Sequence, residues 1–94
     1  MKMEKNLERA FFWFQKASEN DYNVAQYNLA LCYQYGKGTK KDLVKAFDWY
    51  QRVVENGYIK AQYNLALLYE GGEGTEKNLE KAFYWYQKSS RKRI

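Results

Sequence analysis

Apolar residues recur along this chain at spacings of three and four, the spacing that lines one face of an α-helix. In one segment the recurrence runs through Leu43, Ala46, Phe47, Tyr50, Val53 and Val54. In another segment, over residues 23–35, the apolar stripe consists of Ala25, Leu29, Cys32 and Tyr33. The pattern predicts two kinds of amphipathic helix, and each needs a neighbour against which to bury its apolar face.

Residues that cap or break helices mark the ends of these segments. Asp42 is suited to begin a helix because its carboxylate can accept hydrogen bonds from first-turn amides, and Asn6 and Asn78 offer a side-chain carbonyl instead. The dipeptide of Asn56 and Gly57 favours a turn, since glycine tolerates the left-handed conformation that ends many helices. We therefore expect helices near residues 6–19, 23–35, 42–55, 59–70 and 78–90.

The whole pattern repeats with a constant period. The tryptophans stand at positions 13, 49 and 85, so that 36 residues separate each one from the next. The sequence AQYNLAL occurs at residues 25–31 and again, letter for letter, at residues 61–67. A fixed period of this length is typical of a solenoid, in which each repeat buries its apolar faces against the next copy.

The repeat predicts an all-α fold, an α/α solenoid of about five antiparallel helices in a single domain over residues 1–94. Residues 6–21 are then the second helix of an incomplete repeat, residues 22–57 the first full repeat, and residues 58–93 the second. A solenoid exposes a helix face at each end unless another repeat or a polar cap covers it. The sequence leaves open an excerpt of a longer array, an engineered array, or a protomer that covers its ends by self-association.

The repeated residues resemble the Sel1-like repeats, which are relatives of the tetratricopeptide repeats. The first copy of the family pattern consists of Ala25, Leu29, Ala30, Tyr33, Gly36, Gly38, Asp42, Lys45, Ala46, Trp49 and Tyr50. The second consists of Ala61, Leu65, Ala66, Tyr69, Gly72, Gly74, Asn78, Lys81, Ala82, Trp85 and Tyr86. The resemblance, which covers about residues 6–90, implies a right-handed superhelix of the tetratricopeptide type and a role as a scaffold that binds other proteins.

Composition agrees with a packed helical protein. The chain has no proline, and 46% of its residues are apolar, which favours helix and argues against disorder. Cys32 is the only cysteine, so no intramolecular disulfide can form, and a buried thiol is expected. The first five residues do not resemble a signal peptide, and no apolar run approaches the roughly 20 residues that cross a bilayer. We expect a soluble, cytoplasmic protein with no membrane partner.

The residues that most enzymes and metal sites require are missing. The chain has no histidine, and its one cysteine cannot build a thiolate cluster. The stretch Gly36-Lys37-Gly38-Thr39 lacks the spacing of a phosphate loop, and Glu73 takes the place of Lys37 in the next copy. We read this stretch as a two-glycine turn. No catalytic, cofactor or metal site is predicted, and we expect no enzyme activity.

A protein or peptide is the partner that the resemblance favours, because in such families the first helix of each repeat tends to line the concave face. The candidate contact residues are Tyr27, Asn28, Leu31 and Gln34 in one repeat and Tyr63, Asn64, Leu67 and Glu70 in the next. Tyrosine offers a large contact area at interfaces, and asparagine can bond to a peptide backbone. The alternative for Tyr27 and Leu31 is that they pack against the neighbouring helix and complete the core.

Two other functions fit the sequence less well. The chain can be a purely structural unit that forms homo-oligomers through its exposed terminal helices. A net charge of +5 permits binding to nucleic acid, but most lysines are interleaved with acidic residues instead of forming one block. Nucleic acid is therefore not the favoured partner.

Overall fold

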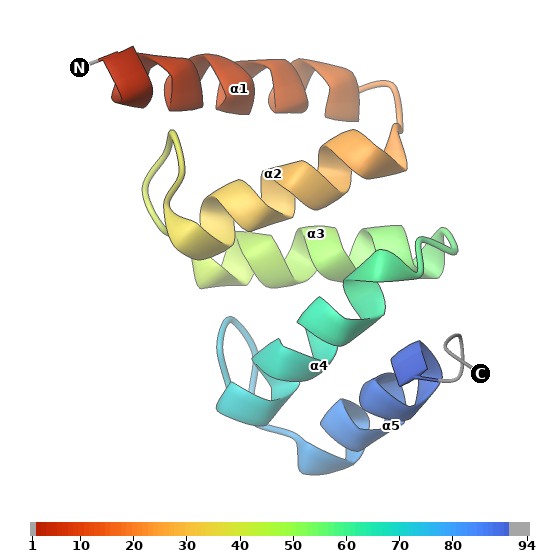
Figure 1. The fold of residues 1–94 in the computed structure, drawn as a ribbon. Helices are drawn as coiled ribbons and strands as arrows, with labels where there is room; N and C mark the ends of the chain where they lie inside the picture. The colour runs from red at the N-terminus through yellow and green to blue at the C-terminus, as the bar shows by residue number, and fades with distance from the viewer. Residues whose placement is uncertain (1, 91–94) are drawn as a thin grey trace.

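The computed structural model describes residues 2–90, and this part of the chain forms five α-helices (Figure 1). They are α1 (Lys2–Ser18), α2 (Asn23–Tyr35), α3 (Leu43–Glu55), α4 (Lys60–Gly71) and α5 (Leu79–Ser90). Each helix packs mainly against the helix that precedes or follows it in the sequence, and the stack measures 41 by 24 by 22 Å. The predicted all-α solenoid of antiparallel helices is confirmed.

Most of the predicted helix ends are also correct. The side chain of Asp42 accepts a hydrogen bond from the Lys45 amide at 3.1 Å, and that of Asn78 accepts one from the Lys81 amide at 3.0 Å. The predicted cap at Asn6 is wrong, because α1 already begins at Lys2. The residues before Asn6 are Lys, Met, Glu and Lys, which favour helix, whereas a glycine loop precedes the other two caps.

Each two-glycine loop connects the two helices of one repeat and contacts the second helix of the repeat before it. Gly38 and Gly74 have φ angles of 73° and 74°, in the left-handed region that favours glycine. A Cβ atom at Gly38 would overlap the backbone carbonyl of Leu7 in α1, and one at Gly74 would overlap that of Leu43 in α3. Glycine is therefore required by the close approach of two backbones as well as by the turn.

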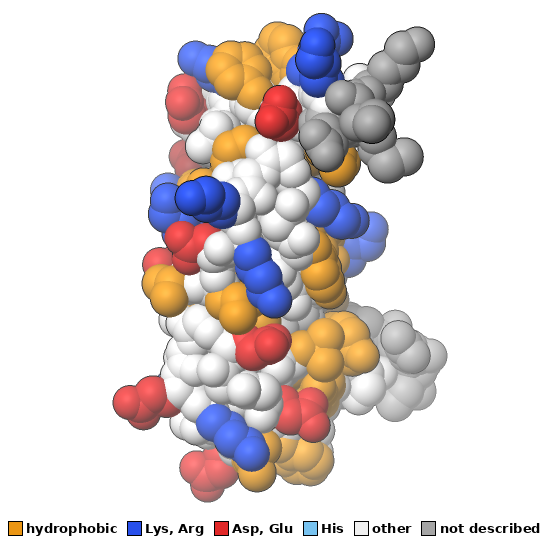
Figure 2. All heavy atoms as spheres, turned by 90° about the vertical axis from the view of Figure 1, so that its left-hand side faces the viewer, with side chains coloured by type: hydrophobic (Ala, Val, Ile, Leu, Met, Phe, Trp, Pro, Cys, Tyr) orange, Lys and Arg blue, Asp and Glu red, His pale blue; other side chains and the backbone are white. Residues whose placement is uncertain are grey.

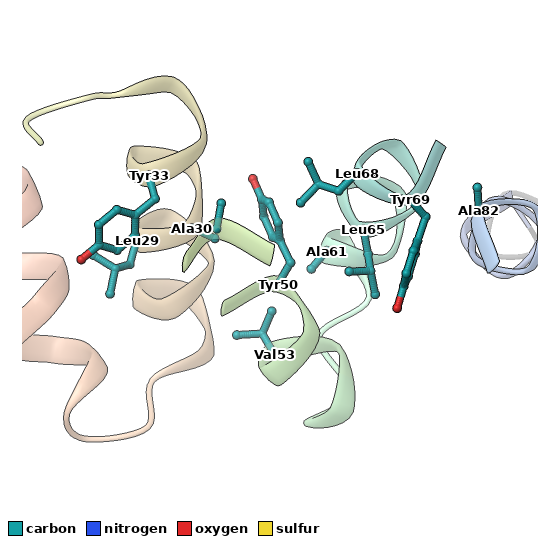
Figure 3. Close-up of a cluster of buried hydrophobic side chains, with 11 residues drawn as sticks. Leu29, Ala30, Tyr33, Tyr50, Val53, Ala61, Leu65, Leu68, Tyr69 and Ala82 are labelled. Atoms are coloured by element: carbon teal, nitrogen blue, oxygen red, sulfur yellow. The ribbon is translucent and has the colours of Figure 1, made fainter. Parts of the chain in front are cut away.

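Small residues allow the helices of the core to lie close together (Figure 3). Ala30, Ala46, Ala61 and Ala66 are completely buried. The larger side chains that fill the remaining space are those of Leu29, Tyr50, Val53, Leu65 and Leu68, all of them buried. Cys32 is buried as expected, and this burial raises the pKa of its thiol, which keeps it protonated and unreactive.

Corresponding aromatic residues occupy corresponding surroundings in successive repeats. The rings of Phe11 and Tyr33 meet edge to face with centroids 5.5 Å apart, and those of Phe47 and Tyr69 do the same at 5.3 Å. Trp13 differs from this regularity, because it is 66% exposed whereas its counterpart Trp49 is half-buried. Within residues 2–90, α1 packs mainly against α2.

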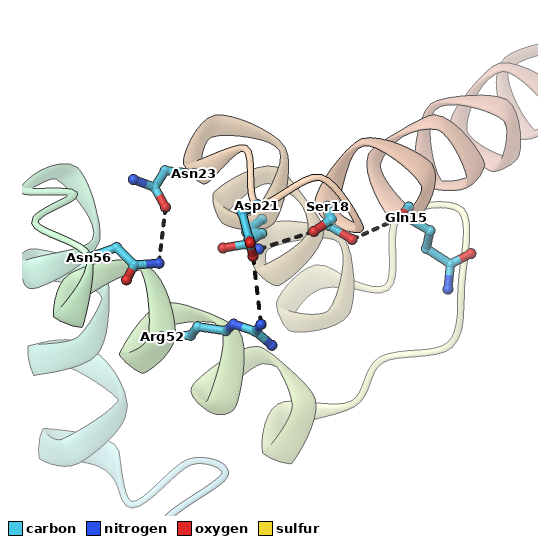
Figure 4. Close-up of polar contacts among 7 residues, drawn as sticks. Gln15, Ser18, Asp21, Asn23, Arg52 and Asn56 are labelled. Carbon is cyan, nitrogen blue, oxygen red and sulfur yellow. Dashed lines mark hydrogen bonds and ion pairs between the residues drawn. The ribbon is translucent and has the colours of Figure 1, made fainter.

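Polar contacts hold the turn between α1 and α2 beside the end of α3 (Figure 4). Arg52 approaches Asp21 at 3.7 Å, and Asn56 Nδ2 donates to Asn23 Oδ1 at 3.4 Å. Since all four side chains meet solvent, these contacts orient the turn more than they stabilise the fold. No helix among residues 2–90 has the combined length and apolar character needed to cross a membrane.

Candidate protein-interaction surface

All eight candidate residues lie on α2 and α4, the first helices of the two full repeats. We call a group of solvent-accessible side chains on these two helices the first-helix face. It consists of Val24, Tyr27, Asn28, Leu31, Tyr35, Tyr63, Asn64, Leu67 and Glu70. Within the described residues no cluster of acidic, cysteine or histidine side chains adjoins this face that could hold a metal ion.

Tyr27 is held between the two repeats. Its ring centroid lies 5.8 Å from that of Tyr50 and 5.3 Å from that of Tyr58. Its hydroxyl donates to Asn64 Oδ1 at 3.1 Å, across 37 residues of sequence. Tyr27 and Leu31 both pack against the core, as the alternative reading of the sequence has it. Only the outer part of the Tyr27 ring remains for a partner.

The hydroxyl of Tyr50 continues this network into the core. It donates to Gln34 Oε1 at 2.6 Å and accepts from Asn64 Nδ2 at 3.4 Å. Burial raises the pKa of Tyr50 far above its ordinary value, so the hydroxyl stays protonated and available as a donor. Gln34 is only 7% exposed. Its amide therefore serves the packing of α2 against α3 and offers little surface to a partner.

The second repeat is more open. Tyr63, the counterpart of Tyr27, is 52% exposed, and its ring centroid lies 5.6 Å from that of Tyr86. The Tyr86 hydroxyl donates to Glu70 Oε1 at 2.5 Å, as Tyr50 donates to Gln34 one period earlier. Partial desolvation and the Glu70 carboxylate raise the pKa of Tyr86 to about 12. Tyr63 is thus the most accessible aromatic side chain among the candidates.

Two residues of the first-helix face were not predicted from the sequence. Val24 and Tyr35 are exposed large side chains on α2. Val24 lies seven residues before Leu31, and Tyr35 lies four residues after it. This helical spacing is enough to predict that all three side chains share one face of α2. With them, α2 presents a continuous stripe from its first turn to its last.

Charges of both signs are mixed on the face shown in Figure 2, which views the molecule from the left of Figure 1. Lys and Arg side chains alternate there with Asp and Glu side chains, and apolar side chains lie between them. A basic stripe that could follow a phosphate backbone is not formed on this face.

Comparison with known sequences identifies the repeat. Residues 1–22, 23–58 and 59–93 match the Sel1 repeat, which confirms the resemblance seen in the sequence. DAP3-binding cell death enhancer 1 from Rattus norvegicus is 50% identical over 32 residues, which are 34% of this chain and 6% of that protein. The protein of the same name from Mus musculus matches equally.

Solved structures share the fold over most of the chain. A Sel1 repeat protein from Oxalobacter formigenes has a TM-score of 0.81 at 37% identity, over 89% of this chain and 35% of its own. The protective antigen c5321 of uropathogenic Escherichia coli has a TM-score of 0.86 at 28% identity, over 90% and 18%. The cysteine-rich protein B of Helicobacter pylori has a TM-score of 0.77 at 28% identity, over 86% and 61%. The chain spans less than two thirds of each of these relatives.

Proposed function

We propose that this chain, which belongs to the Sel1 repeat family, is a scaffold that binds a peptide or protein segment on the concave face formed by its first helices. Sel1 repeat proteins are generally protein-interaction scaffolds. The single observation that supports the proposal most is the first-helix face itself, where Tyr63 and Leu67 reach solvent beside the Asn64 amide.

The chemistry of this face suits an extended or helical segment with apolar side chains. Tyr63 and Leu67 supply apolar contact area, and the rigid tyrosine ring loses little conformational entropy on binding. Asn28 and Glu70 supply polar groups at its edges. Since two repeats bury less area than a long array, the affinity of the isolated chain is modest.

The partner is proposed only by class. The rat and mouse relatives carry a name that describes them as binding DAP3, and they match this chain over 32 residues. This supports a binding role for the repeat, while the partner of this chain depends on its own exposed residues.

A peptide selection tests the proposal. Peptides selected from a random display library on the folded chain are expected to lose affinity about tenfold or more when Tyr63→Ser and Leu67→Ser are combined, because interface tyrosines are often energetic hot spots. Titration calorimetry measures the change, and far-UV circular dichroism confirms the fold. The control combines Val44→Ser and Tyr84→Ser, two exposed residues of the second helices, and should leave the affinity unchanged.

Two outcomes contradict this proposal. One is a first-helix double variant that binds as tightly as the parent chain. The other is a selection that yields no peptide, or only peptides lost equally in the control variant.

Self-association is the second candidate function, because α5 exposes Leu79, Phe83 and Tyr84 and α1 exposes Phe12 and Trp13. These residues belong to α5 and α1, the helices at the two ends of the stack (Figure 1). Light scattering over a range of concentrations tests self-association. A molar mass that equals that of the monomer at every concentration excludes it.

A further inference from the structure

The cage around Tyr27 has a counterpart one repeat earlier. Tyr27 rests against the rings of Tyr50 and Tyr58 and donates its hydroxyl to Asn64. The residues 36 positions before these three are Phe14, Tyr22 and Asn28. All three of them line one cavity of about 710 Å³ between α1 and α2, together with Trp13, Ala17, Asn23, Val24, Ala25 and Tyr58.

The lining of this cavity is aromatic and exposed where the cage around Tyr27 is closed. Tyr22 is 62% exposed, whereas its counterpart Tyr58 is half-buried beneath Tyr27. Trp13 is likewise exposed, whereas its counterpart Trp49 is half-buried. The walls of the cage are therefore also present at α1 and α2. No described residue corresponds to Tyr27, the side chain that fills the cage in the next repeat.

At the polar end of the cavity, the Asn28 side chain can accept a hydrogen bond from a hydroxyl group. In the closed cage Asn64 Nδ2 donates to the Tyr50 hydroxyl, which leaves Oδ1 to accept from Tyr27. Phe14 lacks that hydroxyl, and Asn28 Nδ2 donates to the Val24 carbonyl at 2.9 Å instead. Asn28 Oδ1 is therefore the atom of this amide that can accept a hydrogen bond, as Asn64 Oδ1 does from Tyr27.

We propose that this cavity receives the tyrosine side chain of a partner helix, which packs on α1 as α2 packs on α3. The ring of the incoming tyrosine lies between Phe14 and Tyr22, and its hydroxyl donates to Asn28 Oδ1. Ala30, three residues after Tyr27, is completely buried and points towards α3 in Figure 3. The partner helix accordingly carries a small residue three positions after its tyrosine, so that it can approach α1 closely.

This site is separate from the scaffold function proposed above. It lies at the α1 end of the stack and shares only Val24 and Asn28 with the first-helix face. Loss of binding at Tyr63 and Leu67 leaves the cavity intact, so the two proposals can fail independently.

The probe is a fluorescently labelled peptide with the sequence of residues 59–71, which carries Tyr63 and, three positions later, Ala66, and also a second tyrosine, Tyr69. Anisotropy titration should show saturable binding to the intact chain. Replacing Tyr63 of the peptide by alanine should weaken binding about tenfold or more, and replacing it by phenylalanine should weaken binding several-fold through the lost hydrogen bond.

Variants of the chain locate the bound peptide. Tyr22→Ala changes an exposed side chain and should weaken binding about tenfold without unfolding the chain. Phe83→Ala, which changes an exposed aromatic residue at the α5 end, should have no effect. The proposal is overturned if the peptide does not bind, if its alanine variant binds equally, or if Phe83→Ala weakens binding while Tyr22→Ala does not.

Discussion

Gly74→Ala is expected to lower the free energy of unfolding by about 3 kcal/mol or more, a large effect for a single methyl group. Part of the loss is conformational, because φ at this position is 74°. The larger part is steric, because the new Cβ meets the backbone carbonyl of Leu43. That carbonyl belongs to the first turn of α3, which the Asp42 cap holds in place, so it cannot move away cheaply.

Gly57→Ala is the matched control for this substitution. Gly57 has a φ angle of 86°, yet a Cβ atom there meets nothing within 4 Å. Gly57→Ala should therefore lower the free energy of unfolding only by the conformational contribution, about 1 kcal/mol. Urea denaturation followed by circular dichroism measures both values. Equal losses in the two variants would show that the loop does not press on α3.

Tyr50→Phe is expected to cost about 2 kcal/mol although it removes a single oxygen atom. The ring still fills its place, but the buried Gln34 Oε1 loses its donor, and Asn64 Nδ2 loses its acceptor. An unpaired buried polar group costs more than the hydrogen bond itself contributes. The same denaturation experiment gives the change.

Tyr86→Phe provides the comparison, because it removes the corresponding hydroxyl one period later. The bond from Tyr86 to Glu70 is exposed to solvent, so water can replace it, and the expected loss is about 0.5 kcal/mol or less. A loss for Tyr50→Phe that is no larger than the loss for Tyr86→Phe would mean that burial does not give the Tyr50 network its stabilising effect.

The period of the sequence was sufficient to predict the helices and most of the core. Helices that cannot bury their apolar faces alone have to stack, so Leu29, Leu65 and their neighbours are buried wherever the stripe continues. The start of α1 was predicted wrongly because the repeat was extended to Asn6 by analogy with Asp42 and Asn78, which follow glycine loops. Local helix propensity decided the outcome there.

The candidate surface was predicted less completely, for a geometric reason. Tyr27, Leu31 and Gln34 share one helical spacing, but a helix turns about 100° per residue, and small offsets move a side chain between solvent and core. Gln34 lies on the side that faces α3 and bonds to Tyr50. Such a bond joins residues of different helices, and nothing in the spacing of the sequence indicates it.

Successive repeats stack through side-chain contacts, and the most direct of these is the hydrogen bond from Tyr27 of one repeat to Asn64 of the next. A double-mutant cycle of Tyr27→Phe and Asn64→Ala measures this contact directly. We predict a coupling free energy of about 1 kcal/mol between the two substitutions. Strictly additive losses would contradict the stacking described for these repeats and the cavity inferred from it.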